Sequence, residues 1–192
     1  MSMIKINPDK DALVVVDLQN DFCPGGALAV PEGNRVVPVI NGLAPHFKHV
    51  FYTQDWHPAN HMSFKEQGGI WPPHCVADTK GAALHPDLRL DFEKAVQVKK
   101  GFEPHKEAYS GFEGTDLAIR LRKANIKRLM VTGLATDYCV KNTVLDALKA
   151  GFIVIVVEDA IRGVEVKPGD SRAALDEMLR AGARISRFSD II

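Results

Sequence analysis

The chain has 192 residues, 46% hydrophobic and 25% charged, a balance typical of one globular domain with a sizeable core. Its 24 basic and 24 acidic residues cancel, so net charge favours neither nucleic acid nor an anionic membrane as a partner. No apolar run reaches the roughly 18 residues of a membrane span, the N-terminus lacks a signal-peptide core, and three cysteines are too few for a disulfide framework. We therefore expect a cytoplasmic protein with a single domain over residues 1–192.

Apolar and helical segments alternate along the chain. The apolar and β-branched segments that predict strands are 12–17, 49–54, 94–99, 128–133, 152–157 and 183–187. The segments between them with helical periodicity are 33–46, 114–125, 137–150 and 170–181. Strands that alternate with helices indicate βαβ units, so we predict an α/β fold with an open, doubly wound, mainly parallel sheet.

The stretch 58–91 departs from this alternation. It is rich in Gly, Pro and His and has little periodicity, and so long a connection is uncommon in a compact domain unless it serves a function. A mobile surface loop is the simpler alternative, but Trp71 and several histidines argue against it. We interpret 58–91 as a lid or metal-site insertion.

A candidate metal site follows the second predicted strand. The sequence Asp55-Trp56-His57-Pro58-Ala59-Asn60-His61 places one carboxylate and two imidazoles within seven residues. These groups supply the oxygen and nitrogen ligands that divalent metals accept. Cys75, beside His74, is left open as a further ligand.

Reactive side chains also follow three other predicted strands. Asp17 ends the first, Lys100 follows the third, and Cys139 follows the fourth. Singly, they could be a turn cap, a solvated charge and a core residue. Ligands of an open parallel sheet bind beyond the carboxyl ends of its strands, so their joint position predicts an active site there.

Cys139 is the predicted nucleophile. Thr136 is a candidate N-cap, which would place Cys139 in the first helical turn, where the helix dipole lowers a thiol pKa. Backbone N–H groups of that turn could also bind an oxyanion. Asp17 is the candidate base, and Lys100 would stabilise the negative charge.

Several motifs resemble those of the isochorismatase-like cysteine hydrolases, and among them the nicotinamidases (pyrazinamidases). The resemblance runs nearly end to end. The motifs that carry it are Val-Val-Asp-Leu-Gln-Asn-Asp-Phe (15–22), Asp-Trp-His-Pro-Ala-Asn-His (55–61), Trp-Pro-Pro-His-Cys-Val (71–76), Lys-Gly (100–101), Tyr-Ser-Gly-Phe (109–112) and Gly-Leu-Ala-Thr-Asp-Tyr-Cys-Val (133–140).

The resemblance implies a six-stranded sheet with helices on both faces and hydrolysis of nicotinamide to nicotinate and ammonia through a cysteine thioester, in NAD salvage, with pyrazinamide also accepted. It implies one divalent metal ion, zinc first, with iron or manganese as alternatives, and a cis peptide at 134–135. The implied site residues are a triad of Asp17, Lys100 and Cys139, an oxyanion hole of Ala135 and Cys139, metal ligands Asp55, His57, His61 and His74, and aromatic walls Phe22, Trp71 and Tyr109.

Other functions fit parts of the pattern. An amidase for N-carbamoyl compounds would share the triad, and a catalytically idle metal-binding protein would share the scaffold. Aryl-isochorismate hydrolases of the superfamily typically lack the cysteine. The partner we expect is a small-molecule amide, with no nucleic acid and no membrane; a homo-oligomer and the choice between His61 and His74 are left open.

Overall fold

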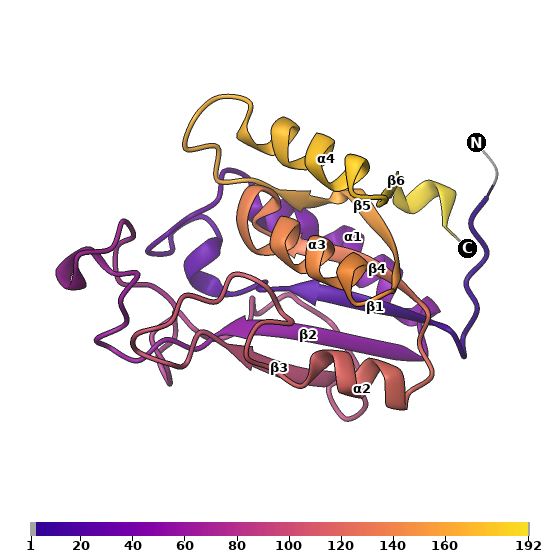
Figure 1. Cartoon of the computed structure of the whole chain (residues 1–192), viewed down its shortest axis with the longest axis horizontal. Helices are drawn as coiled ribbons and strands as arrows, with labels where there is room; N and C mark the ends of the chain where they lie inside the picture. Colours follow the sequence, from indigo (N-terminus) through magenta and orange to yellow (C-terminus); the bar gives the residue numbers. More distant parts are fainter. Residues whose placement is uncertain (1–2, 192) are drawn as a thin grey trace.

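A six-stranded, all-parallel sheet forms the centre of the computed structural model, which describes residues 3–191 (Figure 1). Its strands are β1 (Asp11–Val16), β2 (His49–Asp55), β3 (Val96–Lys100), β4 (Arg128–Leu134), β5 (Ile153–Arg162) and β6 (Arg184–Ser186). They lie in the order β3-β2-β1-β4-β5-β6. The chain therefore builds outward from β1 to one edge, returns to β4 beside β1, and builds to the other edge, as a doubly wound sheet does.

Four α-helices connect the strands. They are α1 (Val36–Leu43), α2 (Leu117–Lys123), α3 (Lys141–Lys149) and α4 (Asp170–Arg180). The single helix expected over 33–46 is α1 with a 3-10 turn at each end. A π-helical turn, Thr136–Val140, leads directly into α3 and carries the predicted nucleophile.

Each face of the sheet packs against its own hydrophobic core. Successive residues of the buried strands contribute in turn to one core and to the other. Leu13 and Val15 of β1 pack in one cluster with the apolar side of α1. Ala12, Val14 and Val16 pack in a second cluster with residues from α2, α3 and α4. Successive residues of a strand point to opposite faces, so the continuous apolar run in β1 is what a strand buried on both sides requires. The predicted α/β fold is confirmed.

One strand differs clearly from its predicted bounds. The run 152–157 predicts a short strand, but β5 continues through Glu158 and Asp159 to Arg162. Its register against β4 shifts between Val131 and Gly133, which allows extra residues to be accommodated. The two acidic residues resemble a turn signal in sequence, yet they continue the strand beyond the point where its continuous apolar run ends.

The long connection between β2 and β3 folds over the carboxyl ends of the strands, at the left of Figure 1. Within the described chain its only helical element is the 3-10 turn Lys65–Gln67. Isolated bridges pair His57 with Val76 and Phe64 with Trp71. This connection therefore brings its histidines back to the end of β2. None of the described helices is long and apolar enough to span a membrane.

Candidate active site

Lys100 lies at the centre of the predicted site. Its side chain has no exposed surface, and its Nζ lies 2.8 Å from Asp17 Oδ2 and 2.5 Å from Asp55 Oδ1. The same ammonium donates to Cys139 Sγ at 3.5 Å and to the Ala108 carbonyl at 3.2 Å. The three residues predicted as a triad thus meet, and one cation contacts both the predicted base and a predicted metal ligand.

Asp17 is held by the neighbouring strand. Thr53 Oγ1 donates to Asp17 Oδ1 at 2.6 Å, and the Asp17 N–H donates to Thr53 Oγ1 at 3.2 Å. Asp17 Oδ2 receives no hydrogen bond of good geometry from the described residues, so this oxygen can still accept a proton. Asp17 has φ of 44°, a backbone conformation that non-glycine residues adopt rarely. The sequence analysis missed Thr53, although Thr53 and Asp55 lie two apart on one strand and so share a face.

Burial dominates the acid–base properties of the nucleophile and the base. Burial raises the pKa of Asp17, and Lys100 opposes that shift. Burial also raises the pKa of Cys139 well above its ordinary value, with Lys100 again acting in the opposite direction. The low thiol pKa expected from the helix dipole is therefore wrong. The resting site favours a protonated thiol beside the carboxylate, from which a proton can pass when a substrate arrives.

The start of the nucleophile helix also corrects a prediction. Ala135, not Thr136, is the N-cap residue, and it makes no side-chain cap bond. Its carbonyl accepts the N–H groups of Tyr138 and Val140, each at 3.1 Å. The 134–135 peptide is cis, as the resemblance implied. Because Cys139 is buried, the desolvation of its thiol outweighs any effect of the helix dipole.

The opposite charges of Lys100 and Asp55 stabilise each other. Burial would raise the pKa of Asp55, but Lys100 and then His57 lower it far below the ordinary range. Burial would lower the pKa of Lys100, but Asp17, Asp55 and Cys139 raise it well above the ordinary value. Lys100 is therefore a permanent cation. Although Asp17, Asp55 and Cys139 lie close enough to form a metal-ligand set, Lys100 contacts all three.

Asp55, His57 and His74 form a second set of donors, with one ligand atom from each within 4.8 Å of the others. His57 Nδ1 bonds to the Gly101 carbonyl at 2.8 Å, and His74 Nδ1 to the Pro72 carbonyl at 2.8 Å. A carbonyl can only accept, so each Nδ1 carries the hydrogen and each Nε2 is left as the donor atom for a ligand. This buried carboxylate–imidazole set fits a divalent metal ion.

His61 lies beside this set but outside it. Its ring stacks on His57 with centroids 4.1 Å apart. Its Nδ1 contacts Ser63 Oγ at 2.7 Å and its Nε2 the Lys106 carbonyl at 3.0 Å, so both nitrogens are engaged. Among the described residues, the structure thus groups His74 rather than His61 with Asp55 and His57, and it does not group Cys75 with them.

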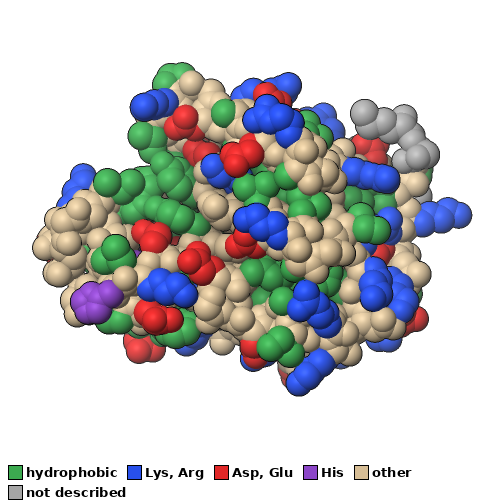
Figure 2. Space-filling view, viewed as in Figure 1, with side chains coloured by type: hydrophobic (Ala, Val, Ile, Leu, Met, Phe, Trp, Pro, Cys, Tyr) green, Lys and Arg blue, Asp and Glu red, His purple; other side chains and the backbone are tan. Residues whose placement is uncertain are grey.

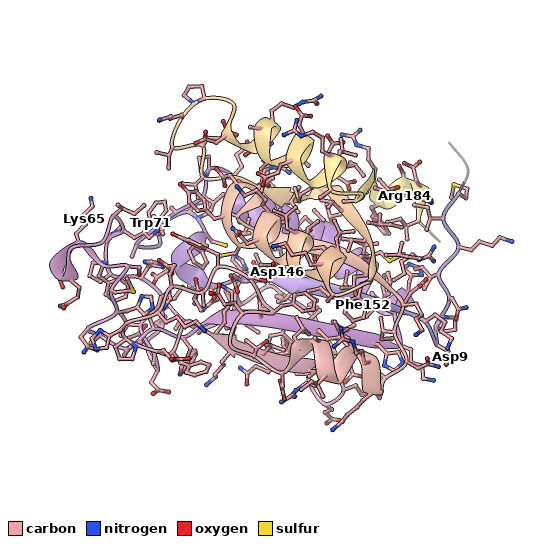
Figure 3. The ribbon with its side chains drawn as sticks, in the orientation of Figure 1. Asp9, Lys65, Trp71, Asp146, Phe152 and Arg184 are labelled. Carbon is pink, nitrogen blue, oxygen red and sulfur yellow. The ribbon has the colours of Figure 1, made fainter. Side chains whose placement is uncertain are left out.

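A pocket with aromatic walls opens onto Cys139. The predicted wall residues Phe22, Trp71 and Tyr109 line it, together with Tyr138 and Val164, which the sequence analysis missed. The Trp71 indole N–H donates to the Tyr109 hydroxyl at 3.0 Å, and Trp71 meets Tyr138 edge to face at 5.0 Å. Figure 3 labels Trp71 among the loops beyond the strand ends, whereas Phe152 and Asp9 lie toward the opposite end.

The remaining lining residues place this pocket between the two groups already described. Asp55 and His74 lie on it, as do Ala135 and Cys139. Tyr138 directly precedes Cys139, so the sequence could have indicated that Tyr138 lines the pocket. Val164 comes from a loop after β5 and carried no such signal. A thiol, a carboxylate and an ammonium beside a metal-donor set are the groups of a hydrolase that attacks through sulfur.

Comparison with known proteins agrees with this class. The Isochorismatase domain model matches residues 11–190. A nicotinamidase from Escherichia coli is 46% identical over 204 aligned residues, covering 93% of this chain and 95% of the relative. A zinc complex of Pyrococcus horikoshii pyrazinamidase has a TM-score of 0.88 at 50% identity and covers 93% of this chain and 99% of that one. PnC1 from L. infantum, in complex with nicotinate, has a TM-score of 0.93 at 35% identity and covers 99% and 98%.

The chain belongs to the isochorismatase domain family. The resemblance drawn from its motifs is thereby confirmed, and its most similar relatives include nicotinamidases.

Proposed function

We propose that this protein is a nicotinamidase, which hydrolyses nicotinamide to nicotinate and ammonia. The observation that carries the proposal is an aromatic-walled pocket lined by Cys139, Asp55 and His74, with the buried Lys100 in contact with both Cys139 and Asp17. Flat aromatic walls suit a pyridine ring, which packs well against other aromatic groups. The nicotinamidase and pyrazinamidase relatives support the same substrate class.

In the proposed first half-reaction, Asp17 takes the Cys139 proton as the sulfur attacks the carboxamide carbon. Asp17 Oδ2 contacts the Lys100 ammonium but has no hydrogen bond of good geometry among the described residues, and this oxygen and the raised pKa of both groups suit a proton that moves only during this step. The Ala135 and Cys139 N–H groups are the proposed oxyanion hole. The protonated Asp17 then gives its proton to the departing ammonia, which leaves a thioester on Cys139.

In the second half-reaction, Asp17 removes a proton from water as the water oxygen attacks the thioester carbon. The C–S bond breaks and the proton on Asp17 returns to Cys139, while the second proton of the water stays on the released nicotinic acid, which loses it to the solvent to become nicotinate. Lys100 stays charged throughout, since three acidic partners raise its pKa, and it stabilises the negative charge near the sulfur.

Asp55, His57 and His74 are the proposed ligands of a divalent metal ion, for which we propose zinc, and His61 stays a predicted fourth ligand. A metal bound there would supply a Lewis acid for the ring nitrogen of the substrate. The donor atoms and the two carbonyls that orient the imidazoles support this assignment. A cytoplasmic location and homo-oligomer formation stay predictions.

Ammonia release from nicotinamide tests the function. Wild type should turn over and show a covalent nicotinoyl adduct in acid-quenched samples, and Cys139→Ala should show neither. Cys23→Ala is the matched control, because Cys23 is also buried but does not line the pocket. An N-carbamoyl compound and pyrazinamide belong in the same assay. Activity on the N-carbamoyl compound alone, or undiminished turnover by the Cys139 variant, would refute the proposal.

A further inference from the structure

Asp137 is a buried carboxylate with no role in the reaction proposed above. It lies two residues before Cys139 in the π-helical turn, and only 7% of its surface is exposed. Its Oδ1 accepts the Val164 N–H at 2.9 Å, and its Oδ2 accepts the Glu165 N–H at 2.8 Å. Both carboxylate oxygens therefore bind one short stretch of backbone in a distant part of the chain.

That stretch belongs to the loop 163–169, between the end of β5 and the start of α4. Its other hydrogen bonds are local: the Gly169 N–H bonds to Glu165, and the Lys167 N–H bonds to Asp170. Among the described residues, the two bonds to Asp137 are the hydrogen bonds that join this loop to the nucleophile turn.

The loop conformation needs such a restraint. Glu165 has φ of 55°, in the left-handed region that non-glycine residues adopt rarely. Gly163 packs so closely against Ser171 and Asp137 that a Cβ there would overlap the Ser171 hydroxyl. A strained loop persists only when its surroundings over-determine it, and the Asp137 carboxylate provides two charge-assisted bonds for that purpose.

The restrained residue Val164 lines the substrate pocket together with the aromatic walls. Val164 also packs against the core cluster that contains Phe22 and Ala135. Its position sets how much space a ring in the pocket has on that side. Val164 can serve as a fixed wall only if the loop is held in place.

We propose that Asp137 is a positioning residue for substrate specificity, because its carboxylate holds Val164 in place as the wall that limits the size of the ring admitted beside Cys139. The inference rests on the proposed amide hydrolysis. It assigns to Asp137 an effect on which substrate binds, and none on the movement of protons or electrons.

Hydrogen exchange tests the tether without any need for activity. Asp137→Asn should speed exchange of the Val164 and Glu165 amides about tenfold, as expected when a charge-assisted bond is weakened. Glu165→Gln is the matched control in the same loop: it should speed exchange at Gly169 and Ser171, which Glu165 caps, and leave Val164 protected. Unchanged exchange at Val164 in the Asp137 variant would overturn the proposal, whatever the activity.

Substrate competition tests the specificity. The ratio of kcat/KM for a 5-methyl-substituted nicotinamide to that for nicotinamide should rise about tenfold in Asp137→Asn and in Val164→Ala, since one methyl group in an apolar pocket discriminates by about that factor. The double variant should show no larger ratio than the greater single effect, because both changes remove the same wall. Glu165→Gln should leave the ratio at the wild-type value.

The results that would overturn the specificity proposal differ from the result that would refute the proposed function. If Asp137 only supports the helix that carries Cys139, kcat falls equally for both substrates and the ratio stays fixed, which overturns the proposal. Additive effects in the double variant overturn it too. If Asp137→Asn does not fold, Asp137→Glu, which keeps the charge on a longer side chain, replaces it in both experiments. A wild type that releases no ammonia refutes the proposed function, and hydrogen exchange still decides the tether.

Discussion

Replacement of Lys100 by methionine tests how strongly the site depends on one buried cation. Methionine has a similar length and keeps most of the packing, but it leaves Asp17 and Asp55 without a counterion. Lys100 Nζ lies 2.8 Å from one carboxylate and 2.5 Å from the other, and its side chain is fully buried. Breaking a buried ion pair costs about 3–5 kcal/mol, and here two carboxylates lose the same partner, so we expect the upper part of that range.

Urea denaturation in the presence of a chelator, followed by tryptophan fluorescence, measures this loss of unfolding free energy. The control is Lys48→Met. Lys48 also lies 2.7 Å from a carboxylate, that of Asp9, but both side chains are mostly exposed. Its loss should be a small fraction of the loss for Lys100, because water already screens the surface pair. A loss of about 1 kcal/mol or less for Lys100→Met would refute the reasoning.

The pH dependence of the unfolding free energy provides a second test, because the direction of its change can be worked out for wild type and for Lys100→Met. In wild type the lowered pKa of Asp55 stabilises the fold above the pKa of the unfolded carboxyl, and this contribution is lost as pH falls through the folded pKa. Without Lys100 the buried carboxylates have raised pKa values, so they destabilise the fold at neutral pH and the penalty fades as pH falls. The stability difference between wild type and Lys100→Met should therefore shrink between pH 7 and pH 4, and a difference that grows would contradict this account.

Three further predictions concern the donor set and the thiol. Gly101→Ala should weaken metal affinity at least ~10-fold in a chelator competition, because a Cβ there would lie 2.5 Å from His57 Cε1. Gly68→Ala is the control, because Gly68 also has a positive φ but lies in open space, so this variant should keep the metal affinity of the wild type. Iodoacetamide labelling of Cys139 should keep accelerating above pH 9, since burial raises its pKa, and a plateau by pH 7 would contradict that. Phe64→Ala should lower the unfolding free energy by about 3–5 kcal/mol in the urea assay, because Phe64 is fully buried against the site histidines; a loss near zero would contradict its packing role.

The sequence predicted the parts of the site that local patterns determine. An apolar run that ends in a reactive residue marks both a buried strand and its carboxyl end, which is how Asp17 and Asp55 could be assigned to one edge of the sheet. Cys139 follows the fourth predicted strand in the same way, whereas the role of Ala135 came only from the resemblance of the motif at 133–140. Each of these residues is positioned by the strand that precedes it.

The missing parts depend on contacts between distant segments. Thr53 bonds to Asp17 across 36 positions, and Asp137 bonds to Val164 across 27. No local pattern indicates either contact. The thiol pKa was predicted in the wrong direction for a related reason: the position of Cys139 near a helix start was visible in the sequence, but its burial was not.

On the face shown in Figure 2, blue and red side chains are interspersed, in keeping with the balanced charge of the chain. This face has no broad area of a single sign. Attraction of a charged substrate over long distances is therefore weak on this side, which suits an amide that carries no net charge.

The sheet order has a consequence for how this site can vary. The four strands that deliver Asp17, Asp55, Lys100 and Cys139 are consecutive neighbours, β3-β2-β1-β4. Backbone hydrogen bonding keeps neighbouring strands about 4.8 Å apart, so the width of the site is fixed by the main chain rather than by any side chain. Among the described residues, β6 supplies none of these groups, and β5 reaches the pocket through the loop that carries Val164. With the proposed role of Val164, one wall of the pocket is thus built on a strand that carries none of the reacting groups, and substitutions after β5 should change specificity while the distances among the reacting groups stay constant.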